Sequence, residues 1–181
     1  MTWANFITLG RLFSAPLIVW LIFTDEAVKA FWITLVAGFS DILDGLVARL
    51  FKVDSVIGAY LDPLADKVLL VSIYISLALK GMIPLWLVIA VVFRDILILG
   101  GVLLIWGLGR QIKIQPLFIS KINTFFQIIS VVFILAVNAY NNLTSIFSLN
   151  VLMMLFYLTA ITTFLSALGY IKLLAKTLND H

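Results

Sequence analysis

The sequence predicts an all-α integral membrane protein, a bundle of six membrane-spanning helices in a single domain over residues 1–181. Hydrophobic residues make up 64% of the chain and charged residues only 12%, and the mean hydropathy is +1.19. A soluble domain is closer to half apolar and one quarter charged. The apolar residues form six long runs, each near the roughly 20 residues that a helix needs to span a bilayer. Because lipid offers the backbone no hydrogen-bond partners, we expect these runs to be helices and not strands.

The six runs follow one another with short polar breaks between them. They are Ile7–Phe23, Phe31–Leu50, Ile57–Leu79, Ile83–Trp106, Phe118–Ala139 and Leu149–Leu174. Ahead of the first run, the short amphipathic segment Met1–Phe6 is expected to lie along the membrane interface.

Basic residues orient the predicted bundle. If both termini are cytoplasmic, the opposite loops carry only Lys29 and Lys80. The cytoplasmic segments then carry Arg49, Lys52, Arg110, Lys113, Lys121, Lys172 and Lys176. By the positive-inside rule, this asymmetry predicts cytoplasmic N and C termini. A bacterial inner membrane fits this arrangement, and we expect membrane lipids, and no nucleic acid, among the partners.

The composition restricts the chemistry that is available. The chain has no cysteine, and its one histidine is the last residue, His181. Cysteine nucleophiles, histidine bases and thiolate or imidazole metal sites are therefore excluded. A metal ion here would be held by oxygen, which points to Mg²⁺, Mn²⁺ or Ca²⁺.

Four aspartates lie in or beside two consecutive apolar runs. The segment Asp41-Ile-Leu-Asp44-Gly45-Leu-Val-Ala48-Arg49 ends the second run, and Gly58-Ala-Tyr-Leu-Asp62-Pro-Leu-Ala-Asp66 opens the third. One charge at the centre of a membrane helix costs about 2.5–3.5 kcal/mol. The predicted topology places Asp41 and Asp44 about 8–12 Å below the cytoplasmic end of their helix, at 1.5 Å per residue. The second pair has a similar depth, so the two pairs are expected to meet.

Four neighbouring carboxylates cannot all stay ionised unless cations lie between them. One or two Mg²⁺ or Mn²⁺ ions would solve this, and a pair of ions can clamp phosphate oxygens and activate a hydroxyl. Gly45 and Ala48 leave room beside the carboxylates, and Arg49 is suited to pair with a phosphate.

Two other interpretations stay open. The aspartates could pair with Lys67, Arg94 or Arg49 and only join helices, although such contacts need one or two polar groups rather than four. They could also line a cation or proton pathway. Transporters usually show inverted repeats or paired broken helices, and the sequence shows neither.

At these residues the chain resembles the CDP-alcohol phosphatidyltransferases. The signature of that family is Asp-x-x-Asp-Gly-x-x-Ala-Arg, then eight residues, then Gly-x-x-x-Asp-x-x-x-Asp. All eight of its positions are matched, by Asp41, Asp44, Gly45, Ala48, Arg49, Gly58, Asp62 and Asp66. The resemblance covers the whole chain, because the family is also a six-helix membrane bundle. It further implies a homodimer and a site at the cytoplasmic face.

The resemblance implies a reaction and a role for each signature residue. An acceptor hydroxyl attacks the lipid-side phosphorus of a CDP-alcohol such as CDP-diacylglycerol, and CMP leaves. The four aspartates would bind two metal ions, and Asp66 would also be the catalytic base. The CDP-binding residues would be Gly45, Ala48, Arg49 and Gly58.

The acceptor depends on a smaller set of residues. The opening Asn5-Phe-Ile-Thr8-Leu-Gly-Arg11 resembles the branch that makes phosphatidylglycerol phosphate or cardiolipin. The residues Asp95, Ser120 and Asn123 resemble the cardiolipin synthases of that branch. We therefore favour phosphatidylglycerol as the acceptor, with glycerol-3-phosphate as the alternative.

Three basic residues are candidates for binding the acceptor: Arg94, Lys113 and Lys121. Arg94 lies near the middle of its run and is expected to point into the bundle, either toward an acceptor phosphate or toward a buried aspartate. Its neighbour Asp95 is expected to face away from it, because adjacent residues do not share a helix face. Lys113 and Lys121 have a second interpretation, as residues that only set the topology.

Overall fold

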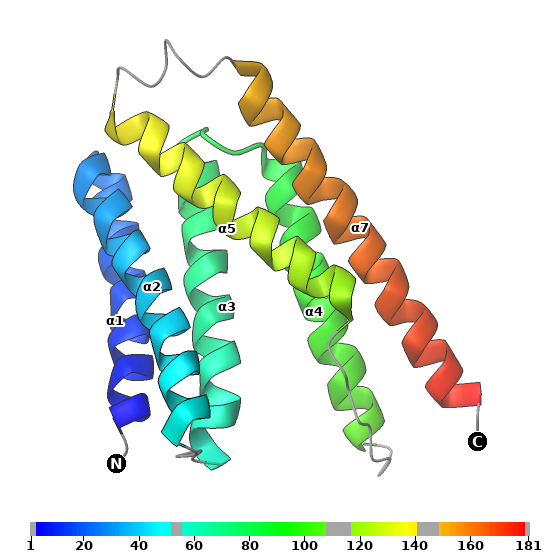
Figure 1. Ribbon diagram of the computed structural model, residues 1–181. Coiled ribbons are helices and arrows are strands. Elements are labelled where there is room, and N and C mark those ends of the chain that lie inside the picture. The colour runs from blue at the N-terminus through cyan, green and yellow to red at the C-terminus, as the bar shows by residue number, and fades with distance from the viewer. Residues whose placement is uncertain (1–2, 52–55, 108–116, 141–148, 180–181) are drawn as a thin grey trace. The chain divides into compact units, whose positions relative to one another are not determined.

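The computed structural model contains helices, and no strand, among the residues that it describes (Figure 1). It describes the backbone of residues 3–51, 56–107, 117–140 and 149–179, and the side chains of residues 10, 12–40, 65–105, 107, 117–140 and 150–175. The helices are α1 (Trp3–Phe23), α2 (Ala27–Phe51), α3 (Val56–Leu79), α4 (Leu85–Gly107), α5 (Phe118–Ala139) and α7 (Leu149–Asn179). Each coincides with one of the six apolar runs, so the all-helical prediction is confirmed.

Several helices are longer than the apolar runs that predicted them. Helix α2 begins at Ala27 and includes Lys29, and α7 continues past Leu174 to Asn179. Backbone hydrogen bonding continues through polar residues, whereas hydropathy marks only the apolar window. For the same reason Trp3–Phe6 forms the first turn of α1, continuous with the rest of that helix.

The described helices have the length and the surface of a membrane protein. Within the described residues, three helices are long and apolar enough to span a bilayer: Leu85–Ile105, Phe118–Ala139 and Asn150–Ala175. Along α4, the large side chains of Leu85, Ile89, Phe93 and Ile96 are all exposed. Their spacing of three or four residues puts them on one face, which suits contact with lipid rather than water. Six spans and cytoplasmic termini stay predictions.

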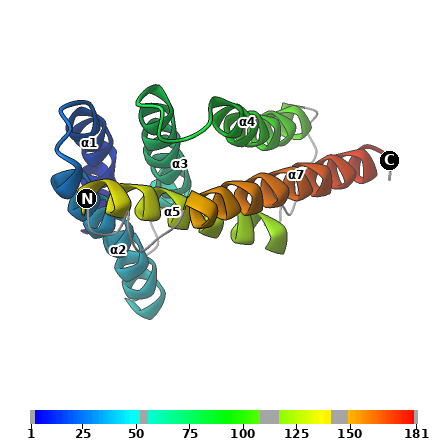
Figure 2. The same ribbon diagram turned by 90° about the horizontal axis from the view of Figure 1, so that it is seen from above.

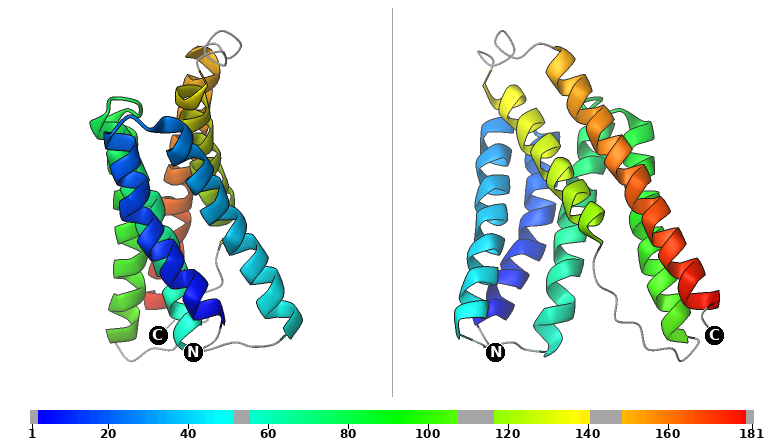
Figure 3. Two further views of the ribbon diagram at one scale, coloured as in Figure 1. Left: turned by 90° about the vertical axis from the view of Figure 1, so that its left-hand side faces the viewer. Right: turned by 45° about the vertical axis from the view of Figure 1, so that its right-hand side comes forward.

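The chain divides into two compact units, the first formed by Met1–Ile83 and Val131–Phe147. In this unit α1 packs against both α2 and α3 (Figure 3). Helix α1 buries Ala15, Ile18 and Ile22, which are spaced by three and four residues and so form one stripe. Lys80, at the end of α3, pairs with Asp25 of the α1–α2 turn at 2.6 Å. Asp25 has a φ of 60°, a left-handed conformation that Asp and Asn tolerate.

The second unit is formed by Pro84–Ser130 and Ser148–His181, so α5 contributes to both units. Here α4 packs against α7, and the two run side by side (Figures 1 and 2). Gly101 of α4 lies directly against the side chain of Leu174 of α7. A Cβ atom added to Gly101 would come within 2.5 Å of the Leu174 side chain. Close packing of this kind is typical of small residues between membrane helices.

This contact gives a prediction with a control at the adjacent residue. Gly101→Ala should lower the stability of the detergent-solubilised protein by about 1 kcal/mol, the low end of the usual cost of overpacking, because the end of the Leu174 side chain must move. Gly100→Ala adds the same methyl group where no atom lies within 4 Å and should leave the stability unchanged or slightly raised. Thermal unfolding of the two variants measures the difference. Equal midpoints would contradict the packing argument.

Candidate functional site

The two halves of the aspartate motif lie on the consecutive helices α2 and α3. Residues 41–49 belong to α2 and residues 58–66 to α3. A helical backbone places residues three or four apart on the same side, which is the register the metal prediction needs. The side chains of seven of these residues lie outside the described residues, as does the whole of Lys113 in the α4–α5 connection. The seven are Asp41, Asp44, Gly45, Ala48, Arg49, Gly58 and Asp62.

Asp66 is the one motif residue whose side chain the structure describes. It is half-buried and follows Ala65, which is buried in the core of the first unit. Among the described side chains, no group of three or more Asp, Glu, His or Cys residues is close enough together to hold a metal ion. The predicted metal site requires three further aspartates beyond that described set, so it stays a prediction. The donor chemistry fits the expected ions, since carboxylate oxygens are the ligands that Mg²⁺ and Mn²⁺ prefer.

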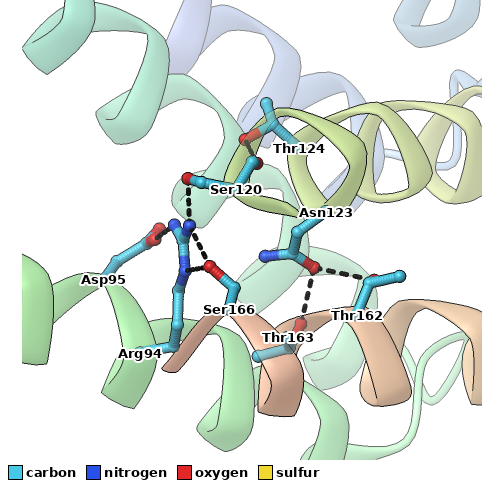
Figure 4. A network of polar contacts seen from close by, with 8 residues as sticks. All are labelled: Arg94, Asp95, Ser120, Asn123, Thr124, Thr162, Thr163 and Ser166. Carbon is cyan, nitrogen blue, oxygen red and sulfur yellow. Dashed lines mark hydrogen bonds and ion pairs between the residues drawn. The ribbon is translucent and has the colours of Figure 1, made fainter. Parts of the chain in front are cut away.

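The described polar side chains gather instead around Arg94, in the middle of α4 (Figure 4). Arg94 is 2% exposed. Its Nε and Nη2 donate to Ser166 Oγ of α7 at 3.1 and 2.7 Å, and its Nη2 also donates to Ser120 Oγ of α5. The ring of Tyr170 lies 5.8 Å from the guanidinium carbon, within range of a cation–π interaction. One arginine therefore links three helices of the second unit.

Asp95 completes this cluster, contrary to the expectation that it faces away from Arg94. Arg94 Nη1 pairs with Asp95 Oδ1 at 2.6 Å, and both side chains are largely buried. Adjacent residues on a helix diverge at Cβ, but the long arginine side chain bends back far enough to reach the carboxylate. The pairing of Arg94 with a buried aspartate is therefore present in the structure, and its contact with an acceptor phosphate stays a prediction.

A second set of polar contacts continues from this cluster along α5 and α7. Asn123 Oδ1 accepts hydrogen bonds from Thr162 at 3.1 Å and Thr163 at 2.8 Å (Figure 4). Further along, Ser130 and Thr159 are hydrogen-bonded at 3.0 Å. We call these residues, together with Ser120 and Ser166, the polar seam. Its members are spaced by three and seven residues on α5 and fall within two turns on α7, so each helix presents one polar stripe within an apolar surface.

The seam unites the residues on which the choice of acceptor was predicted to depend. Arg94, Asp95, Ser120 and Asn123 all belong to it or to the cluster beside it. Lys121 does not: it is exposed on α5, and its side chain makes no hydrogen bond or ion pair in the described part of the chain. Sequence reasoning missed the contribution of α7. The available signal was the spacing of Thr159, Thr162, Thr163 and Ser166, which repeats at helical intervals inside an apolar run.

Comparison with known proteins identifies relatives over nearly the whole chain. A family model described as CDP-alcohol phosphatidyltransferase matches residues 1–171. The chain is 36% identical to "CDP-diacylglycerol--glycerol-3-phosphate 3-phosphatidyltransferase 1, chloroplastic" of Oryza sativa subsp. japonica, covering 92% of this chain and 55% of the relative. It is 33% identical to "Cardiolipin synthase (CMP-forming)" of Rattus norvegicus, covering 96% of this chain and 61% of the relative. The chain thus spans about three fifths of the length of the curated relatives it matches.

The pairing of Arg94 with Asp95 gives a prediction about stability. Arg94→Met removes the cation that Asp95 contacts, together with the donors to two serines, and should destabilise the protein by about 3–5 kcal/mol. The double variant Arg94→Met/Asp95→Asn also removes the carboxylate charge that Arg94 contacts and should recover part of that loss. Thermal unfolding in the same detergent measures both. A double variant as unstable as Arg94→Met alone would show that the charge pair is not the source of the effect.

Proposed function

The chain belongs to the CDP-alcohol phosphatidyltransferase family, and on that basis we propose that it transfers a phosphatidyl group from CDP-diacylglycerol to a glycerol-based acceptor. The observation that carries this proposal is the family match across residues 1–171, which includes the complete eight-residue signature. The curated relatives are named for this class of transfer.

The proposed reaction is a substitution at phosphorus. A hydroxyl oxygen of the acceptor forms a bond to the lipid-side phosphorus, the bond from that phosphorus to the bridging oxygen breaks, and CMP leaves with the electron pair. Asp66 accepts the proton of the attacking hydroxyl. Gly45, Ala48, Arg49 and Gly58 hold the CDP group in place, since positioning supplies much of the rate enhancement in such reactions.

Asp41, Asp44, Asp62 and Asp66 would hold two Mg²⁺ or Mn²⁺ ions. When bound, such ions stabilise the negative charge that develops on phosphate oxygens. Ionised aspartates contribute acceptor oxygens only, so four of them on the consecutive helices α2 and α3 favour a cationic partner. An α2–α3 site that opens to the cytoplasm would let a nucleotide product leave into water. We also propose the six-span topology, a bacterial inner membrane location and a homodimer.

We favour phosphatidylglycerol as the acceptor, which makes the product cardiolipin. Arg94 was the candidate partner for an acceptor phosphate, and its charge is matched by Asp95. This supports an acceptor whose reacting end is an uncharged glycerol. Lys121, which is exposed, and Lys113 are the proposed contacts for its anionic head group. Glycerol-3-phosphate is the second candidate, because the 36% identical relative is named for that acceptor.

Offering the purified protein CDP-diacylglycerol, Mg²⁺ and one acceptor at a time tests the reaction. We expect CMP release and, with phosphatidylglycerol, a lipid product with the mass of cardiolipin. EDTA should stop the release, because the carboxylates need their cations. Phosphatidylglycerol phosphate formed from glycerol-3-phosphate, with no cardiolipin from phosphatidylglycerol, would overturn the preferred acceptor. No CMP with any acceptor would favour the cation or proton pathway instead.

Asp66→Asn should lower kcat about 10²–10⁴-fold, the range expected when a general base is lost. Asp25→Asn is the matched control, because it makes the same chemical change at an exposed turn and asparagine tolerates the positive φ there. That control should keep its activity. The measurement is the rate of CMP release at saturating substrate, with unfolding midpoints to confirm that both variants fold. Equal losses in the two variants would contradict the assigned role of Asp66.

A further inference from the structure

The polar seam contains the side-chain amide of Asn123, whose oxygen accepts hydrogen bonds and whose nitrogen lacks an acceptor among the described residues. Asn123 is 0% exposed, and its Oδ1 accepts hydrogen bonds from both Thr162 and Thr163. Its Nδ2 has no acceptor within hydrogen-bond distance among the described residues. Buried side-chain donors in folded proteins are nearly always hydrogen-bonded, to protein or to an ordered oxygen. The Asn123 amide therefore has an unused donor within the described part of the chain.

Ser166 offers a second donor beside that amide. Its Oγ accepts two hydrogen bonds from Arg94, at 3.1 and 2.7 Å, and is fully buried. The hydroxyl proton has no acceptor in the described part of the chain, whereas the Thr159 hydroxyl donates to the carbonyl four residues earlier. Figure 4 shows the Asn123 nitrogen on the side of the amide that faces Ser166. Two donors thus lie on the same side of the seam.

The charge of the neighbourhood restricts what these donors bind. Arg94 is paired with Asp95 at 2.6 Å, so the positive charge nearest to Ser166 is already neutralised. An anion would therefore bring an uncompensated charge into a buried site, which is costly in a low-dielectric interior. An uncharged oxygen atom carries two lone pairs and receives both donors without that cost.

We propose that Asn123 Nδ2 and Ser166 Oγ together bind one uncharged oxygen acceptor within the polar seam. Two sources have this chemistry: an internal water molecule and the ester carbonyl of a membrane lipid. Buried waters typically satisfy otherwise unpaired polar groups in this way. The proposal does not depend on the proposed function, since it concerns a part of α5 and α7 that has no assigned step in the reaction.

Solid-state NMR of the full chain tests this proposal. The protein carries ¹⁵N-labelled asparagine and is reconstituted in liposomes of phosphatidylcholine, either ester-linked or ether-linked. The Asn123 side-chain signal is assigned by its absence from Asn123→Asp, which keeps the size of the residue, or from Asn123→Ser if that variant does not fold. We expect a hydrogen-bonded amide proton that either receives magnetisation from water in both lipids or changes its shift between the two lipids.

Transfer of magnetisation from water in both lipids identifies water as the source of the bound oxygen. A shift that differs between the ester-linked and ether-linked lipids identifies a lipid carbonyl. Thr163→Val is the matched control, because it removes a hydroxyl from the opposite end of the same amide and should preserve the signal. Ser166→Ala removes one of the two proposed donors and should weaken it severalfold. An amide proton with no transfer from water and the same shift in both lipids would overturn the proposal. Equal weakening in Thr163→Val and Ser166→Ala would overturn the assignment to Ser166.

Discussion

A helix within hydrocarbon has no solvent to pair with its polar groups, and the described structure follows from this constraint. The backbone satisfies it by forming helices. Polar side chains satisfy it locally by bonding to the carbonyl four residues earlier, as Thr34, Ser76 and Thr159 do, each at 2.8 Å. These bonds allow hydroxyl residues to occupy helices that are otherwise apolar. Polar groups too large for such local bonding have to find partners on other helices.

Arg94 is the clearest of these, because no local carbonyl can satisfy a guanidinium. Its donors reach Asp95 on its own helix, Ser120 on α5 and Ser166 on α7. Breaking these contacts would leave the buried guanidinium without acceptors, and the cost of such a group exceeds the gain from an average hydrogen bond. Arg94 therefore fixes α4, α5 and α7 of the second unit in one register, and its hydrogen bonds with the two serines place them for the seam that continues along α5 and α7.

The positions of the helices could be predicted from sequence because the length and polarity of an apolar run need no knowledge of its neighbours. The cluster around Arg94 could not. The expectation that Asp95 faces away from Arg94 used the direction of Cβ, which does not limit where a long side chain ends. Ser166 is 72 residues away from Arg94, and the sequence around Ser166 does not predict this contact. The aspartate motif could be recognised because its spacing is local to two helices, and its side chains beyond Asp66 lie outside the described residues.

The polar seam and the four aspartates both place polar groups in apolar helices, and the two sets find their partners in different ways. The seam combines donors and acceptors, so its hydroxyls, amide and ion pair mostly satisfy one another, and it needs at most one added oxygen. The four aspartates are all acceptors when ionised, and no arrangement of them alone can be neutral. A set of that kind is stable in a membrane only with cations supplied from outside. The difference in donor balance is why the proposed chemistry is assigned to α2 and α3, whereas the described contacts of Arg94 hold three helices of the second unit together.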